Sequence, residues 1–155
     1  MNHRNYDWHR RSHAFFILLL SLFIIQGCSY RLIAAYDEKT QEAIFASAKA
    51  IDQFYGFLLE ANENERAYSK YSDKYVEIEA QLNALVLRNK VRNLNEDSTD
   101  IAERMLNLWR RYKDRHKEKD TYKTGMAKLD RKRFERMFSY SVRAEGAKKS
   151  GTSDE

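Results

Sequence analysis

The chain has 155 residues, of which 33% are charged, with no proline and only 5 glycines. This length supplies one domain with a single core rather than several domains, and the composition disfavours a turn-rich β-sandwich and favours long helices. The formal net charge of +5 falls to +3 once the three arginines and one aspartate of residues 1–27 are set aside. So small a charge argues against a nucleic-acid partner.

Residues 1–27 have the pattern of a signal peptide. Arginines and histidines precede a 12-residue apolar run at residues 14–25. The run is shorter than the roughly 20 apolar residues that cross a hydrocarbon core. An uncleaved anchor extended through Ala35 would place Gln26 and Arg31 in hydrocarbon, at a cost of about 3 kcal/mol for the arginine alone. We therefore predict a cleaved leader.

The leader ends in a four-residue motif around the only cysteine of the chain. Ordinary signal peptidase needs small side chains at positions −3 and −1, and Ile25 does not satisfy the first. Ile25, Gln26, Gly27 and Cys28 instead resemble the lipobox of bacterial lipoproteins, with an aliphatic residue at −3, a small one at −1 and the acceptor cysteine. Gln26 at −2 departs from the usual pattern. The resemblance implies diacylglyceryl transfer to the Cys28 thiol, cleavage before Cys28 and acylation of the new amine.

Lipidation of Cys28 would also remove the free thiol that a lone cysteine otherwise leaves in an exported protein. In enterobacterial lipoproteins, Asp after the lipidated cysteine retains the protein in the inner membrane, so Ser29 implies the periplasmic face of the outer membrane. We expect residues 28–36 to be a lipidated tether and residues 37–143 a helical bundle. Residues 144–155 offer nothing to bury and are predicted to be a disordered tail.

Three segments of the mature chain have apolar residues at alternating spacings of four and three, and a shorter fourth segment is also amphipathic, which indicates four helices. Asp37 is expected to cap the first helix, and Ser98 or Thr99 the third. The predicted fold is all-α, an antiparallel helical hairpin extended to a three- or four-helix bundle. The predicted core positions are Ile44, Ala48, Ile51, Tyr55 and Leu58, then Tyr71, Tyr75, Ile78, Leu82 and Leu85, then Ile101, Met105, Leu108 and Tyr112, then Met126, Leu129, Phe134, Met137 and Phe138.

Three polar breaks separate these segments. They lie at residues 60–66, at residues 93–99 and at Thr124–Gly125. The first is short, which is typical of the connection in an αα-hairpin. The aromatic residues Phe45, Phe54, Tyr55 and Phe57 of the first helix allow two interpretations, a groove for a ligand or partner and packing in the core, of which core packing is favoured.

Charge is distributed unevenly along the chain. Residues 110–136 carry 12 Lys or Arg against 5 Asp or Glu, whereas residues 37–66 carry 3 against 7. The basic segment is either a solvated helix face or a contact for an anionic surface or an acidic envelope protein. The solvated face is the favoured interpretation.

No pattern of catalytic or metal-binding residues is recognisable. His116 is the only histidine after the leader and lies among lysines and arginines, so we expect it at the surface. Without a second histidine or a free cysteine, a metal cluster of the usual kind is not expected, and no cofactor is predicted. Carboxylates on the predicted helices are interpreted as solvated or as ion-paired at i,i+4, rather than as an acid–base pair acting on glycan. They are Glu38, Glu42, Asp52, Glu77 and Glu79.

From about Ser29 to Lys149 the chain resembles an uncharacterised family of small helical lipoproteins of Gram-negative bacteria. The resemblance lies in Tyr36–Asp37 with Thr40 soon after, in residues 51–55 (IDQFY), in a hairpin partner with tyrosines and in a closing helix that ends in a lysine pair. It implies a fold and a location but no activity.

These observations predict a non-catalytic, lipid-anchored periplasmic module that binds or scaffolds another component of the cell envelope. An accessory peptidoglycan-acting enzyme is one alternative. A mobile-element exclusion or envelope-stress lipoprotein is another.

Overall fold

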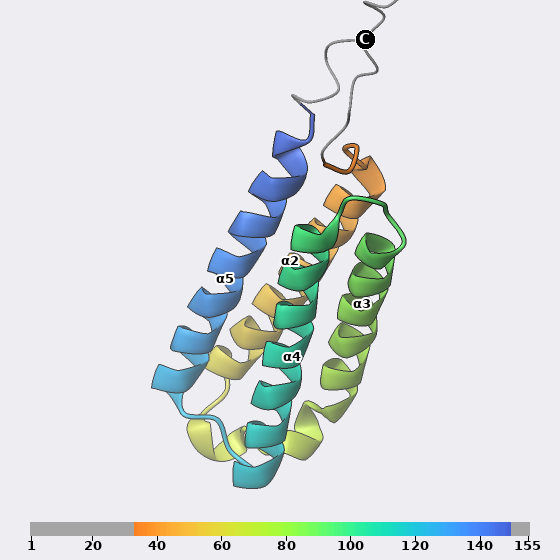
Figure 1. Cartoon of the computed structure of the whole chain (residues 1–155). Coiled ribbons are helices and arrows are strands. Elements are labelled where there is room, and N and C mark those ends of the chain that lie inside the picture. Colours follow the sequence, from red (N-terminus) through yellow and green to blue (C-terminus); the bar gives the residue numbers. More distant parts are fainter. Residues whose placement is uncertain (1–32, 150–155) are drawn as a thin grey trace, which may run out of the picture. The chain divides into compact units, whose positions relative to one another are not determined.

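The computed structural model describes residues 33–149. Four α-helices follow one another along this part of the chain (Figure 1), with two short 3₁₀ helices between the first and the second. The predicted leader, Cys28 and residues 150–155 of the predicted tail lie outside the described residues. The helices are α2 (Glu38–Glu60), α3 (Ser72–Lys90), α4 (Glu96–Lys119) and α5 (Thr124–Ala147), and the 3₁₀ helices are η1 (Glu63–Glu65) and η2 (Tyr68–Lys70).

The helices form an up-down-up-down bundle. Helix α2 packs against α3 and α5, and α4 packs against the same two helices, with neighbours antiparallel. The prediction of an all-α bundle grown from an antiparallel hairpin is confirmed, with four helices in the described chain. Within residues 33–149, none of the helices combines the length and the apolar character that crossing a membrane requires.

Aromatic side chains from three helices fill the middle of the core. The ring of Phe54 lies 4.9 Å from that of Trp109 and 4.7 Å from that of Tyr75, and the Trp109 indole N–H donates to the Tyr75 carbonyl at 3.1 Å. The Phe54–Trp109 pair is edge-to-face, and aromatic pairs contribute about 1 kcal/mol each beyond the area they bury. The stripes predicted for α2, α3 and α4 all face this core. The prediction for α5 is wrong in its first two positions, because Met126 and Leu129 are exposed.

Of the two predicted helix caps, one is confirmed and one is wrong. Asp37 does cap α2, accepting from the Lys39 backbone N–H at 3.2 Å. Helix α4 begins at Glu96, directly after its N-cap residue Asn95. Ser98 and Thr99 therefore lie within the helix, and neither caps its N-terminus. Thr99 instead donates to the Asn95 carbonyl at 2.9 Å.

The third break also lies elsewhere than predicted. Thr124 and Gly125 belong to the first turn of α5, and the chain turns at Asp120, which is left-handed at φ 48°. Aspartate tolerates this conformation better than most residues. The Glu63 side chain accepts the Thr124 backbone N–H at 2.6 Å and so satisfies a donor that α5 cannot satisfy itself.

The folded region extends beyond the predicted limits at both ends. Helix α5 runs to Ala147, and Glu145 is 1% exposed and Lys148 6% exposed. The prediction that the tail starts at residue 144 is therefore wrong. At the other end Ala34 is buried and its N–H donates to the Leu94 carbonyl at 2.9 Å, so the last residues of the predicted tether pack on the bundle. The apolar periodicity did not predict that these two regions are folded, because polar contacts hold both of them on the bundle.

Candidate binding groove

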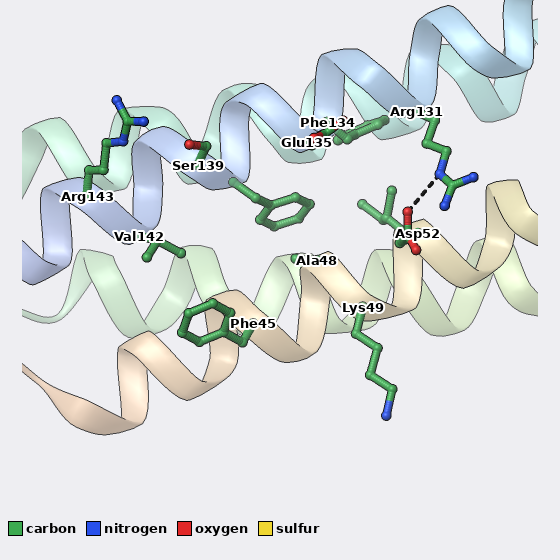
Figure 2. A pocket seen from close by; sticks show the side chains of 12 residues that line it. Phe45, Ala48, Lys49, Asp52, Arg131, Phe134, Glu135, Ser139, Val142 and Arg143 are labelled. Atoms are coloured by element: carbon green, nitrogen blue, oxygen red, sulfur yellow. Dashed lines mark hydrogen bonds and ion pairs between the residues drawn. The ribbon is translucent and has the colours of Figure 1, made fainter.

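A groove of about 560 Å³ lies between α2 and α5. Its floor is apolar and comes from both helices, and its rim carries charges of both signs. Figure 2 shows Phe45 of α2 facing Val142 of α5 across it. The floor residues are Ala48, Ile51, Phe134, Phe138 and Val142, and the charged rim residues are Lys49, Asp52, Arg131, Glu135 and Arg143.

Side-chain size explains why two packed helices leave a hollow here. Ala48 on α2 and Ser139 on α5 are short and line the same groove. Neither reaches far enough to fill the space between the helices, and Phe45 stands at its edge with 53% of its surface exposed. An exposed phenylalanine beside an apolar hollow is the kind of surface at which proteins bind partners.

The four aromatic residues considered on the first helix fall into two groups, one buried and one exposed. Phe54 and Tyr55 are buried in the core, as the favoured interpretation predicted. Phe45 and Phe57 are exposed, at 53% and 62%, and Phe45 lines the groove. The sequence indicated a groove only through the less favoured interpretation of these aromatic residues, as a site for a ligand or partner.

One ion pair closes the groove at its end toward the α4–α5 loop. The Arg131 Nε donates to Asp52 Oδ1 at 2.7 Å, and this hydrogen bond raises the pKa of the Arg131 guanidinium. Both side chains are largely exposed, so the pair contributes about 0–1 kcal/mol to stability. Lys49 points away from the groove (Figure 2), leaving the apolar floor accessible.

His116 is buried, which corrects the prediction that it lies at the surface. Its Nε2 lies 2.8 Å from the Arg66 carbonyl, and its Nδ1 lies 3.0 Å from the Tyr75 hydroxyl. A carbonyl can only accept, so Nε2 carries a proton. Burial lowers the pKa of the ring and so favours its neutral form, in which Nδ1 accepts from the Tyr75 hydroxyl. Its spacing after Met105, Trp109 and Tyr112 continues the core stripe of α4, a signal that the charged neighbours obscured.

A second buried polar cluster surrounds Asp130. Its carboxylate accepts from the Tyr122 hydroxyl at 2.7 Å and from the Arg115 guanidinium, and Tyr122 also contacts the Tyr55 hydroxyl at 3.4 Å. Burial raises the pKa of both phenols, which keeps them protonated as donors. Neither this cluster nor His116 lines the groove. We interpret both clusters as devices that hold the helices in register.

The carboxylates considered from the sequence are dispersed. Glu79 binds Arg110 and Lys113 of α4, and Glu77 binds Lys74. Glu38 and Glu42 are exposed on α2. Only Asp52 reaches the groove. Among residues 33–149 no group of three or more His, Cys, Asp or Glu side chains is placed to hold a metal ion.

The basic segment 110–136 forms the α4–α5 corner of the bundle. Six of its twelve cations make ion pairs with carboxylates. A hollow of about 310 Å³ at this corner is lined by Arg115, Lys119 and Lys123 among others. Asp130 and Glu118 bind the first two of these cations. This partial neutralisation makes the corner a weaker candidate site than the groove.

We compared the chain with models of protein families, with curated proteins and with solved structures, and none of the three comparisons gave a match. The resemblance to small helical lipoproteins consequently stays a prediction from the sequence.

Proposed function

We propose that this protein is a non-catalytic, lipid-anchored helical module of the cell envelope that binds an amphipathic helix of a partner protein in the α2–α5 groove. The observation that carries the proposal is the apolar groove itself, with Phe45 exposed at its edge. We place the module on the periplasmic face of the outer membrane, held by lipid on Cys28.

The shape and charge of the groove favour a helical partner. The groove runs between two antiparallel helices, so a third helix can lie along it and bury residues spaced i, i+3, i+4 and i+7 against its floor. Arg143 and Glu135 on the rim offer charges of both signs to the polar face of that helix. Such rim charges fix register and orientation more than they add affinity.

The anchor rests on the sequence around residue 28. A 12-residue apolar run followed by Ile25, Gln26, Gly27 and Cys28 fits a lipoprotein leader, and multiple acyl chains anchor stably where one chain is marginal.

The alternatives receive less support. A peptidoglycan-acting enzyme of the usual kind needs two carboxylates flanking the bond to be cut. The groove has an apolar floor, and of its two rim carboxylates, Asp52 and Glu135, the first is bound by Arg131. A mobile-element exclusion or stress-response role would be a biological context for the same binding module, and the genes beside this one would reveal it.

Site-specific photo-crosslinking in cells tests the proposal. A photoreactive phenylalanine analogue replaces either Phe45 or Phe57, two exposed phenylalanines of α2. We expect one discrete crosslinked protein from position 45 and none from position 57. We also expect the product to disappear when Ser139→Trp fills the groove, a change at an exposed position.

Equal products from the two positions, or a product that survives Ser139→Trp, would contradict a role for the groove. A product consisting of two crosslinked copies of this chain would show that the groove binds a second copy of the chain and not a different protein. No product at position 45 would argue against any stable occupant.

A further inference from the structure

The chain enters the bundle at the end that also holds the α3–α4 loop and the last turn of α5. The Ala34 N–H donates to the Leu94 carbonyl in that loop, and the Lys149 ammonium lies 4.4 Å from the centre of the Tyr36 ring. We call this the entry end. The opposite end, with η1, η2 and the α4–α5 loop, lies a full helix length away (Figure 1).

The entry end carries apolar side chains that the bundle leaves uncovered. Ile33 is 48% exposed, Val91 is 73% exposed and Leu94 is 49% exposed. Val91 is the C-cap of α3, and Leu94 follows it in the loop that holds Ala34. An apolar group spread over two adjoining segments differs from a single exposed side chain, which needs no explanation.

The backbone of Leu94 adds an independent observation. Leu94 is left-handed at φ 58°, a conformation that costs roughly 1–2 kcal/mol for a residue with a Cβ. Asparagine, which tolerates it better, stands on both sides as Asn93 and Asn95. An asparagine at position 94 would adopt this conformation with less strain, so folding does not require the exposed leucine there.

The length of chain before the entry end points to one occupant for this surface. Five peptide units separate Cys28 from Ile33, so a lipid on Cys28 lies within about 18 Å of the entry end. A membrane held that close by the anchor is available to any apolar group on the entry end. No other surface of the bundle is tied to Cys28 by so short a segment.

The charges of the entry end determine whether its contact with a membrane requires anionic lipids. Arg92 and Lys148 bind Glu145, Arg88 binds Asp37, and Lys90 binds Glu103. Lys149 lies over the Tyr36 ring, and Glu96 and Asp97 in the first turn of α4 are exposed carboxylates at the same end. The paired cations and these carboxylates leave little attraction for anionic headgroups, so contact with the membrane depends on apolar insertion.

We propose that the entry end is a membrane-docking surface, in which Ile33, Val91 and Leu94 insert into the lipid interface and orient the bundle. The inference rests on the proposed anchor at Cys28. It means that the bundle stands on the membrane with its far end outward, and that the α2–α5 groove runs away from the lipid surface toward a partner.

Fluorescence of the lipidated full-length protein in phosphatidylcholine vesicles tests this orientation. An environment-sensitive dye is attached at Val91→Cys or, as the control, at Val76→Cys. Val76 is also an exposed valine of α3, at 65%, and lies about 22 Å from Val91 along the helix. We expect dye at position 91 to shift to the blue and lose most of its emission to lipids with brominated chains. Dye at position 76 should change little.

The outcomes separate the docking surface from the anchor. Vesicle-bound protein in which the two positions are quenched alike, or neither is, would overturn the docking surface and leave the anchor standing. Labelling of the wild-type chain, whose only cysteine is Cys28, would show a free thiol and overturn both proposals.

Discussion

The Glu145 carboxylate, near the end of α5, accepts the backbone N–H of Asp37 at 2.8 Å, although 108 positions separate the two residues. Asp37 is the N-cap of α2, so one hydrogen bond joins the start of the first described helix to the end of the last. The Arg92 and Lys148 cations bind the same carboxylate at 2.9 and 2.7 Å. Burial alone would raise the pKa of Glu145, but these three donors outweigh it and lower the pKa.

Glu145→Gln should lower the free energy of unfolding by about 3 kcal/mol at neutral pH, because it leaves the largely buried Arg92 and Lys148 without a carboxylate. Urea denaturation measures the change. Glu135→Gln, at an exposed position of the same helix, should change stability by less than about 0.5 kcal/mol.

The same pair of proteins gives a pH test. The Glu145 pKa is lowered by folding from its ordinary value of 4.5, so its stabilisation is present above pH 4.5 and disappears as the pH falls through the folded-state pKa. The difference between the wild type and Glu145→Gln should therefore shrink in acid. A difference that stays constant from pH 7 to pH 3 would contradict the charged network.

His116 should make the protein less stable just below neutral pH. Its ring is neutral when folded and burial lowers its pKa, whereas the unfolded chain takes up a proton near pH 6.5. Stability should fall as the pH falls below 6.5, by up to about 1.4 kcal/mol per pH unit. His116→Gln keeps a donor and an acceptor without a titrating group, and should lack this slope between pH 7.5 and 5.5. Equal slopes in the two proteins would show that His116 does not titrate on unfolding.

Leu94→Gly should stabilise the protein by about 0.5–1 kcal/mol. Glycine relieves the left-handed strain of roughly 1–2 kcal/mol and loses about 0.5–1 kcal/mol through its extra freedom in the unfolded chain. Leu87→Gly, an equally simple change at an exposed position inside α3, should instead destabilise by about 1 kcal/mol. Thermal denaturation of both variants shows whether the signs are opposite. A loss of stability in Leu94→Gly would mean that its side chain supports the fold.

The apolar periodicity was sufficient to predict the helices, their antiparallel order and most of the core. It failed where polar side chains do the packing, because a pattern of apolar residues cannot indicate a buried ion pair. Glu145 is bound by Arg92, which comes from the distant α3–α4 loop, and Lys148 is in turn held by Glu145. His116 continues the stripe of α4 that faces the core, but its charged neighbours in the sequence led to the prediction that it lies at the surface. The groove depends on the absence of bulk at Ala48 and Ser139, which only the facing of α2 and α5 reveals.

The mass of the mature protein extracted from membranes tests the central claim most directly. We expect a chain that begins at Cys28 and carries the added mass of a diacylglyceryl group and an amide-linked acyl chain, with Cys28→Ala unprocessed. A wild-type chain that retains residues 1–27, or that is cut elsewhere with Cys28 unmodified, would contradict the lipid-anchored module.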